Sequence, residues 1–258
     1  MPPEPVDRDY WNSLAETYGR DLLEIVHEAG AGVLRDEIAR FAAPEHRVAD
    51  LGCGPGSLLP FLSKHFREVV AVDYAEELLD AARRRCGERN VTFHRHDLSS
   101  GKELRLEVEV ACCVNALIDP DRRKREMMVR TVASSVAAGG TVVIIVPALE
   151  SVFHVYHSLL RCRRRQGSPA GLTEKQAERD LAAEVDSLAG GIVRVGGVPT
   201  KYWMREEIAG ALEDHELMVK RMRRVEYAWK EEIDDPPAWL LKPQPWDWLV
   251  VAQRVTGA

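Results

Sequence analysis

A short glycine-rich turn is the part of the sequence best suited to hold a ligand. Glycine occupies three of the five positions 52–56, directly after the apolar run 48–51. Backbone without side chains can approach a bound molecule closely, and free N–H groups at such a turn can face that molecule. Asp73 ends the next apolar run and could accept hydrogen bonds from both hydroxyls of a ribose. The pattern therefore indicates a nucleoside-containing ligand over the turn. The turn residues expected to contact it are Gly52, Cys53, Gly54 and Gly56.

Two further carboxylates accompany the turn. Asp50 lies inside the first apolar run, and Asp97 follows the third run at 91–93, where it could accept a hydrogen bond from an adenine amino group. The carboxyl ends of parallel strands share one edge of a sheet, so these acids should converge with Asp73. A dinucleotide fingerprint would have a third glycine where Ser57 stands. Asp50 also favours a positively charged ammonium or sulfonium, which makes a nicotinamide or flavin dinucleotide the weaker alternative.

The elements that must position these residues alternate along the chain. Short apolar runs, the longer ones rich in β-branched residues, are separated by stretches with helical spacing. This order predicts strands buried on both faces and joined by right-handed crossovers. Two more strands, 217–227 and 248–255, follow a helix at 205–214 and predict an antiparallel edge hairpin joined by the loop 234–246. The fold class is therefore α/β, a doubly wound Rossmann-like sheet of seven strands. The expected parallel strands are 48–51, 69–73, 91–93, 108–114 and 141–146, with helices at 58–64, 75–86 and 122–138 between them.

The glycine turn and its acids resemble those of a known family. The segment 48–56 resembles motif I of class I S-adenosylmethionine-dependent methyltransferases, and Asp73 resembles the acid that ends their second strand. The resemblance covers about 46–150 and 205–258. It implies S-adenosylmethionine as the cofactor and S-adenosylhomocysteine as the product. It also implies that the glycines of the turn approach the methionine moiety and that Asp73 holds the ribose.

The resemblance implies further cofactor contacts. Asp97 and the backbone of Leu98 would read the adenine, and Asn115 matches the position beside the transferable methyl group. The acid that the family commonly has at this last position is absent, so the resemblance does not make Asn115 a base. The long N-terminal helix resembles an aromatic lid of small-molecule members, although its aromatic residues could equally anchor it to the core. The remaining expected cofactor contacts are Tyr74, Trp11 and Tyr18.

Helical segments flank the predicted sheet. The N-terminal part has helical apolar spacing that Gly30 and Gly32 are expected to interrupt, giving two helices. The stretch 151–204 is predicted as an insertion with helices at 153–165 and 173–188, followed by glycine pairs that are hinges of a lid or ordinary loop residues. We therefore divide the chain into an N-terminal helical lid (1–45), a cofactor-binding core (46–150), a helical acceptor cap (151–204) and the C-terminal part of the sheet (205–258).

Candidates for catalysis lie in the insertion. Methyl transfer from a sulfonium is an in-line displacement in which positioning contributes most, and a base is needed only for a protonated oxygen or nitrogen of high pKa. His154 and His157 lie three residues apart on one helical face and are candidates for a base or an acceptor contact. The alternative is that they are ordinary helix histidines. Tyr202 is a third candidate.

The composition limits the kinds of partner that we expect this chain to bind. Lys plus Arg number 35 and Asp plus Glu 41, and the net charge of −6 makes nucleic acid an unfavourable partner. The five cysteines form no Cys-x-x-Cys pair, so we expect neither a metal site nor disulfides. Without a long apolar run or a leader pattern, we expect a cytoplasmic protein that does not enter the membrane.

These observations lead to one main hypothesis. The chain is expected to be a methyltransferase for a small-molecule acceptor, acting as a monomer or homodimer. The alternatives are an RNA-modifying methyltransferase and a protein that binds the cofactor without turnover and serves a partner. Basic runs at 161–165 and 220–224 keep the RNA alternative open, although solvent-exposed faces commonly carry such runs.

Overall fold

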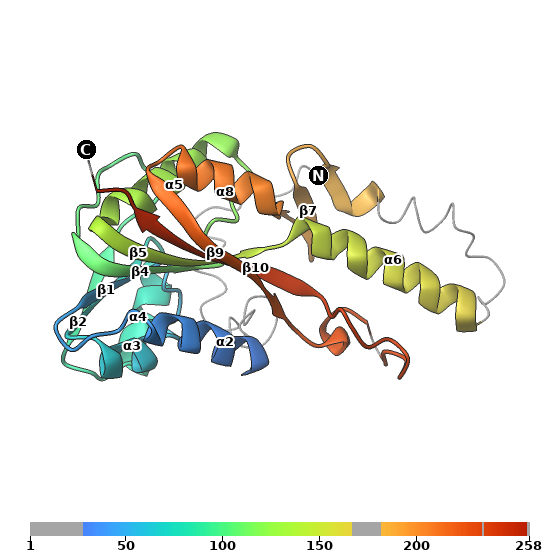
Figure 1. Cartoon of the computed structure of the whole chain (residues 1–258), viewed down its shortest axis with the longest axis horizontal. Helices are drawn as coiled ribbons and strands as arrows, with labels where there is room; N and C mark the ends of the chain where they lie inside the picture. The colour runs from blue at the N-terminus through green and yellow to red at the C-terminus, as the bar shows by residue number, and fades with distance from the viewer. Residues whose placement is uncertain (1–27, 167–181, 234, 257–258) are drawn as a thin grey trace.

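A seven-stranded mixed sheet forms the centre of the molecule (Figure 1). The structure is a computed structural model that describes residues 28–166, 182–233 and 235–256. The strand order is β3-β2-β1-β4-β5-β10-β9, and β10 runs opposite to the other strands of this sheet, pairing antiparallel with β5 and β9. The predicted α/β fold with its antiparallel C-terminal hairpin is confirmed. The strands are β1 (Arg47–Leu51), β2 (Glu68–Asp73), β3 (Val91–Arg95), β4 (Val108–Val114), β5 (Val136–Pro147), β9 (Leu217–Glu226) and β10 (Trp246–Arg254).

Helices cover both faces of the sheet (Figure 1). One face is covered by α2 (Glu28–Ala39), α3 (Leu59–His65) and α4 (Glu76–Arg85), and the other by α5 (Arg122–Ser135) and α8 (Arg205–Glu213). Because side chains alternate along a strand, each central strand contributes to two separate cores. In β1, for example, Val48 joins the core beneath α2 to α4, while Ala49 and Leu51 join the core beneath α5 and α8.

The first described helix corrects one expectation. Gly30 and Gly32 were expected to interrupt the helical pattern, but α2 runs continuously through both. A glycine inside a helix costs roughly 1 kcal/mol relative to alanine. The side chains of Leu34 and Ile38 are buried against the sheet, and buried Glu37 forms ion pairs with β9, so packing outweighs this cost. The rest of the expected N-terminal helical lid lies outside the described residues.

The insertion also differs from the sequence-based expectation. Its first helix, α6 (Leu149–Gln166), begins earlier than predicted. The expected helix at 173–188 is wrong over Val185–Ser187, which forms a strand, and its 173–181 part lies outside the described residues. Three short strands make a separate antiparallel sheet that the sequence analysis missed. They are β6 (Val185–Ser187), β7 (Ile192–Val195) and β8 (Val198–Lys201).

The glycine pairs of the insertion belong to this small sheet. Gly196 and Gly197 have φ angles of 56° and 85° and connect β7 to β8 directly. A two-residue hairpin loop of this kind requires positive φ at both positions, which glycine adopts without strain. This pair is therefore a tight turn. The small sheet is anchored to the main one where the Trp203 N–H donates to Pro147 O over 2.8 Å.

An arm extends from the carboxyl edge of the parallel strands (Figure 1). It contains α6 and the connection between β9 and β10, which includes the short helix η1 (Trp229–Glu231). Cys162 of α6 packs with Trp229 and Leu240 of that connection. None of the helices within the described ranges is long and apolar enough to cross a bilayer.

Candidate functional site

Glycine is required by the backbone at the turn between β1 and α3. The φ angles of Gly52, Gly54 and Gly56 are 75°, 51° and 78°, in the left-handed region that residues with a Cβ rarely adopt. A Cβ on Gly52 would lie 2.5 Å from the Cβ of Ala116, which follows β4. The turn therefore packs against the end of β4, and its shape depends on missing side chains.

The N–H groups of this turn are already engaged. The sequence analysis expected free N–H groups to face the ligand, and this expectation is wrong for 52–56. Pro55 has no N–H group, and the others donate within the protein. An anion such as a phosphate needs such donors and would find none in this turn. The bonds run from Gly52 N and Cys53 N to Val72 O (2.8 and 2.9 Å), from Gly54 N to Asp73 Oδ2 (2.9 Å) and from Gly56 N to Cys53 O (3.0 Å).

Two buried carboxyl groups lie beside the turn. Asp50 and Asp73 are 3% and 6% exposed and sit on the neighbouring strands β1 and β2. Burial, and then the nearby Asp73 charge, raise the pKa of Asp50 to about 7. Burial also raises the pKa of Asp73, against hydrogen bonds from the Ala75 and Gly54 amides. Since burial and mutual repulsion both disfavour the ionised forms, a cation between them would be stabilised.

Asn115 has an unsatisfied polar atom at the same edge. It follows β4, its φ is 51°, and its N–H donates to Ile145 O over 2.9 Å. The side chain is 8% exposed, and its Oδ1 has no hydrogen-bond partner among the described residues. A buried acceptor left in this state costs about 1–3 kcal/mol, and left-handed backbone at a non-glycine residue adds strain. Both costs are typical of a position that contacts a ligand.

The residues expected to read adenine lie at the end of β3. Asp97 is exposed, and its Oδ1 accepts hydrogen bonds from Ser99 N (2.8 Å) and Ser99 Oγ (2.7 Å). Leu98 is buried, and its carbonyl accepts from the hydroxyl of Thr131 over 2.9 Å. Asp97 therefore stabilises the local turn, and its contact with adenine stays a prediction. Tyr74 is half-buried directly after Asp73. Trp11 and Tyr18 lie outside the described residues.

The predicted catalytic residues lie in different surroundings. The centre of the His154 ring lies 5.2 Å from that of Trp229 and 5.5 Å from that of Trp246. Its Nε2 lies 2.8 Å from Pro243 O. In that contact Nε2 carries the proton and donates, which leaves Nδ1 as the basic atom. His157 is exposed on α6. A base or acceptor-contact role for these histidines and for Tyr202 stays a prediction.

Asp247 is a candidate that the sequence analysis missed. It pairs with Pro147 at the end of β5, its side chain is 3% exposed, and its Oδ2 finds no hydrogen-bond partner within the described part of the chain. Burial, and then Glu232, raise its pKa well above the ordinary value. Burial also raises the pKa of Tyr202, with Glu232 and Asp247 adding to the shift. In the sequence, Asp247 stands as one acid between two tryptophans at the start of a mostly apolar strand.

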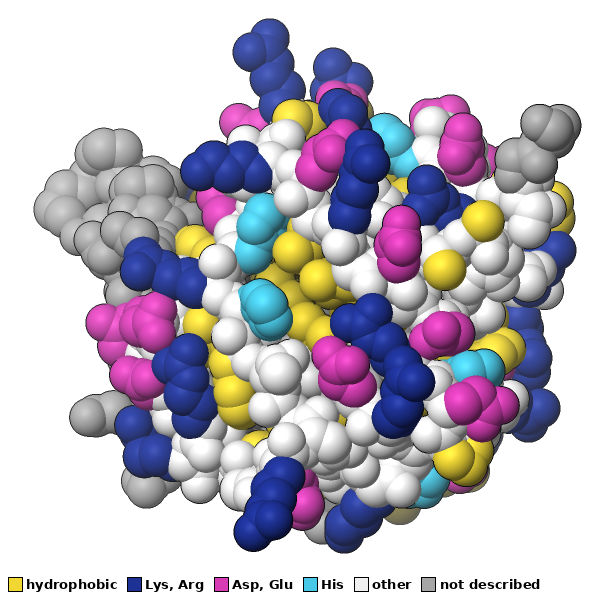
Figure 2. All heavy atoms as spheres, turned by 90° about the vertical axis from the view of Figure 1, so that its left-hand side faces the viewer, with side chains coloured by type: hydrophobic (Ala, Val, Ile, Leu, Met, Phe, Trp, Pro, Cys, Tyr) yellow, Lys and Arg dark blue, Asp and Glu magenta, His cyan; other side chains and the backbone are white. Residues whose placement is uncertain are grey.

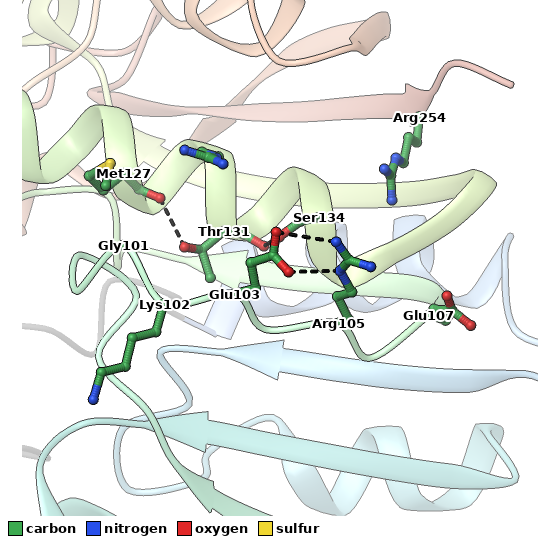
Figure 3. A pocket seen from close by; sticks show the side chains of 10 residues that line it. Gly101, Lys102, Glu103, Arg105, Glu107, Met127, Thr131, Ser134 and Arg254 are labelled. Atoms are coloured by element: carbon green, nitrogen blue, oxygen red, sulfur yellow. Dashed lines mark hydrogen bonds and ion pairs between the residues drawn. The ribbon is translucent and has the colours of Figure 1, made fainter. Parts of the chain in front are cut away.

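A surface groove lies elsewhere on the molecule. It has a volume of about 340 Å³ and is lined by α5, the 101–107 segment and Arg254 (Figure 3). These residues lie toward the amino ends of β4 and β5, away from the turn at 52–56. Figure 2 views this side of the molecule, where basic and acidic side chains are interspersed. Within the groove, Arg105 forms an ion pair with Glu103 over 2.9 Å. The lining therefore carries charges of both signs.

Comparison with known proteins agrees with this geometry. Residues 48–140 match a family model described as a methyltransferase domain. A 63-residue segment is 43% identical to malonyl-[acyl-carrier protein] O-methyltransferase of Bacillus cereus, covering 24% of this chain and 22% of that protein. The chain thus aligns with about a fifth of this curated relative.

Solved structures share the fold. A Methanosarcina mazei SAM-dependent methyltransferase superposes with a TM-score of 0.62 at 16% identity, covering 86% of this chain and 98% of that one. Magnesium protoporphyrin IX methyltransferase from Synechocystis PCC 6803, solved with bound SAH, gives 0.60 at 16% identity, covering 96% and 97%. The sheet around the glycine turn therefore has the class I methyltransferase fold.

Proposed function

We propose that this chain, whose residues 48–140 match a methyltransferase domain and whose sheet has the class I fold, is an S-adenosylmethionine-dependent methyltransferase acting on a small-molecule acceptor. One observation carries the proposal. The turn 52–56 keeps its N–H groups for internal hydrogen bonds, while Asp50 and Asp73 present buried carboxyl groups beside it. Such a site suits a ligand with positive charge and ribose hydroxyls better than one with phosphates.

The residues of the site fit this cofactor. Asp73 fixes the turn through Gly54 N, and its carboxylate oxygens have lone pairs left to accept from ribose hydroxyls. Asp50 lies beside Asp73, where its carboxylate would attract the positive groups of the cofactor. Asn115 Oδ1, unpaired within the described ranges, can accept a hydrogen bond from the ligand's ammonium group. The cofactor when bound supplies a methyl group already activated by the positive sulfur. Asp97 and Leu98 would contact the adenine at the end of β3.

The chain's own contribution to transfer is positioning. An in-line displacement needs the acceptor lone pair about 3 Å from the methyl carbon, with water excluded. Beyond β4 the sheet edge continues through the end of β5 to the start of β10, and Trp203, two residues after β8, bridges to Ala148 beside it. The acceptor must approach from there, where the insertion supplies Tyr202. If the acceptor requires a base, His154, His157 and Tyr202 are the candidates, and their substitution would lower turnover more than cofactor affinity.

An RNA acceptor is the less favoured alternative. Of the two basic runs that kept it open, the one at 161–165 is partly used in packing, because Arg161 and Arg165 lie 5.3 and 4.3 Å from the ring centre of Trp239. In addition, the net charge is −6. One solved structure with a similar fold, at 17% identity, is the complex between the Haloferax volcanii Trm112 methyltransferase activator and its methyltransferase. We propose that this chain acts without nucleic acid, as a monomer or homodimer in the cytoplasm.

A labelling assay tests the function. The full chain is incubated with methyl-labelled S-adenosylmethionine and either a small-molecule extract or total RNA. Label in the extract supports the proposal, and label in RNA alone supports the alternative. Cofactor binding by equilibrium dialysis without label in either fraction would support a non-catalytic binding protein. Absence of cofactor binding would overturn all three.

Cofactor affinity should depend on pH through Asp50. Its pKa of about 7 in the free protein falls when a positive group binds, because the charge stabilises the carboxylate. Below pH 7 binding must therefore release a proton, and affinity should fall by up to about tenfold per pH unit down to pH 5. Above pH 7 it should level off. Calorimetry with S-adenosylhomocysteine at four pH values measures this slope.

The matched variant is Asp50→Asn, which keeps the shape of the side chain and removes its charge. We expect this variant to bind more weakly at pH 8 and to lose the slope between pH 5 and 7. An affinity that rises toward acid pH in the unsubstituted protein, or an unchanged slope in the variant, contradicts the role of Asp50.

A further inference from the structure

A second group of polar side chains, with buried Asp247 at its centre, lies along the same sheet edge as the cofactor residues. Asp247 is the second residue of the strand β10, beside the end of β5. Tyr227 follows β9, with its N–H donating to Pro245 O over 2.9 Å and its hydroxyl to Glu232 Oε1 over 2.7 Å. Tyr202 follows β8. We call these four residues the Asp247 cluster: Tyr202, Tyr227, Glu232 and Asp247.

Asp247 faces the same side of the sheet as Asp50. Side chains alternate along β10, and Trp246 and Trp248 belong to the core beneath α5 and α8. Asp247 therefore points to the opposite face, together with Leu249. The same alternation in β1 places Asp50 on that face with Val48. The two acids are thus on one face and at one edge of the sheet.

The four residues are close enough to influence one another electrostatically. Burial raises the pKa of Tyr202 and of Tyr227, and for both tyrosines Glu232 and Asp247 are the next causes in size. A hydrogen bond from the backbone of Ala148, directly before α6, favours the charged form of Asp247 and so lowers its pKa. A buried carboxyl group with one unpaired oxygen, next to a second acid, is costly unless a cation joins it.

We propose that the Asp247 cluster binds an ammonium group of the methyl acceptor, and that the acceptor is accordingly a small cationic amine. This inference rests on the proposed methyltransferase function. Asp247 Oδ2, which has no partner among the residues that the structure describes, would accept a charge-assisted hydrogen bond from the ammonium group. The rings of Tyr202 and Tyr227 add an electron-rich surface that attracts cations. Glu232 is exposed, so the cluster reaches solvent on its side.

The position of the cluster separates the bound ammonium group from the reacting atom. β5 lies between β4, which ends next to Asn115, and β10, which has Asp247 near its start. Neighbouring strands are about 4.8 Å apart, so two steps span about 10 Å. The ammonium group therefore anchors the acceptor at one end, and the atom that receives the methyl group lies toward β4.

Three molecules with the same alkyl chain test this charge preference: n-hexylamine, hexan-1-ol and hexanoate. Each is titrated by calorimetry into the full chain saturated with S-adenosylhomocysteine. We expect n-hexylamine to bind at least tenfold more tightly than the other two. Equal or tighter binding of the alcohol or the carboxylate overturns the proposal.

Variants locate the binding to the cluster. Asp247→Asn keeps an oxygen for the Ala148 amide and loses the charge, so we expect at least a tenfold loss of n-hexylamine affinity with affinity for S-adenosylhomocysteine within about twofold. Glu232→Gln replaces an exposed side chain, so this variant should fold normally. Its affinity for n-hexylamine should fall by about threefold. Asp214→Asn, an exposed acid at the end of α8, is the matched control and should change nothing.

The outcomes separate the two proposals. If S-adenosylhomocysteine does not bind the unsubstituted chain, the methyltransferase function fails and the inference fails with it. If it binds but n-hexylamine affinity is unchanged in Asp247→Asn, only the ammonium site fails. Should Asp247→Asn not fold, Glu232→Gln decides, because unchanged n-hexylamine affinity in that variant overturns the inference.

Discussion

Substitution of Asp73 by alanine is expected to weaken binding of S-adenosylmethionine by about 2–3 kcal/mol, or roughly 30- to 150-fold. Two effects combine in this loss. The ribose hydroxyls lose a charged acceptor, and the turn loses the bond between Gly54 N and Asp73 Oδ2 that holds it in place. The Ala75 N–H, 3.0 Å from Oδ1, also loses its partner. Calorimetry with S-adenosylmethionine and S-adenosylhomocysteine measures the change.

Two variants control for indirect effects. Asp73→Asn retains one acceptor oxygen and the size of the side chain, so its affinity should lie between those of the unsubstituted chain and Asp73→Ala. Asp80→Ala removes an exposed acid from α4 that pairs with Arg83. Because exposed ion pairs contribute little to stability, the affinity of this variant should match that of the unsubstituted chain. Unchanged affinity in a folded Asp73→Ala protein would reject the assignment of Asp73 to the ribose.

The second large effect concerns stability. Glu207→Ala is expected to lower the free energy of unfolding by about 2–3 kcal/mol, because it leaves a buried ammonium group without its counter-charge. Lys201 is 0% exposed, and its Nζ donates to both carboxylate oxygens of Glu207 over 2.5 and 2.6 Å and to Gly190 O over 2.8 Å. The pair joins the small sheet to α8. In a chain of this size, the melting temperature should fall by about 5–10 °C.

The neighbouring Glu206→Ala is the matched control for this result, since Glu206 is exposed on the same helix turn and should shift the melting temperature by less than about 2 °C. Removing both charges with Lys201→Met and Glu207→Gln should cost less than Glu207→Ala alone. If the two single glutamate variants melt at the same temperature, the buried pair contributes no stability.

The main sheet could be predicted because its signals are local. The β-branched run at 69–73 and the glycine turn at 52–56 each have one physical explanation, and both were placed correctly. Asp50 and Asp73 could be brought together without coordinates, because parallel strands end at one edge. The antiparallel hairpin likewise followed from two strands after the last helix.

The missed features depend on tertiary contacts. Gly30 and Gly32 give the local signal of an interruption, yet burial of Leu34 and Ile38 keeps α2 continuous. The engaged N–H groups of the turn could not be foreseen, because the partner carbonyl of Val72 belongs to another strand. The strand at Val185–Ser187 is short, and nothing in so few residues distinguishes it from the end of a helix.

Asp247 was missed for a different reason. An isolated acid in an apolar strand gives no indication of whether it faces solvent or the interior. Its burial depends on the pairing of β10 with both β5 and β9, and its neighbours Tyr202 and Glu232 come from other parts of the chain. Sites assembled from separate segments are the ones that sequence reasoning finds last.

The place of β10 between β5 and β9 has a consequence for biosynthesis. On the ribosome, residues 246–254 emerge after every other described strand, so β9 has no sheet partner until then. The nascent chain therefore carries two open strand edges, on β5 and on β9, and such edges promote association with other chains. The half of the sheet that holds the glycine turn can assemble early, while Asp247 arrives with the strand that closes the fold.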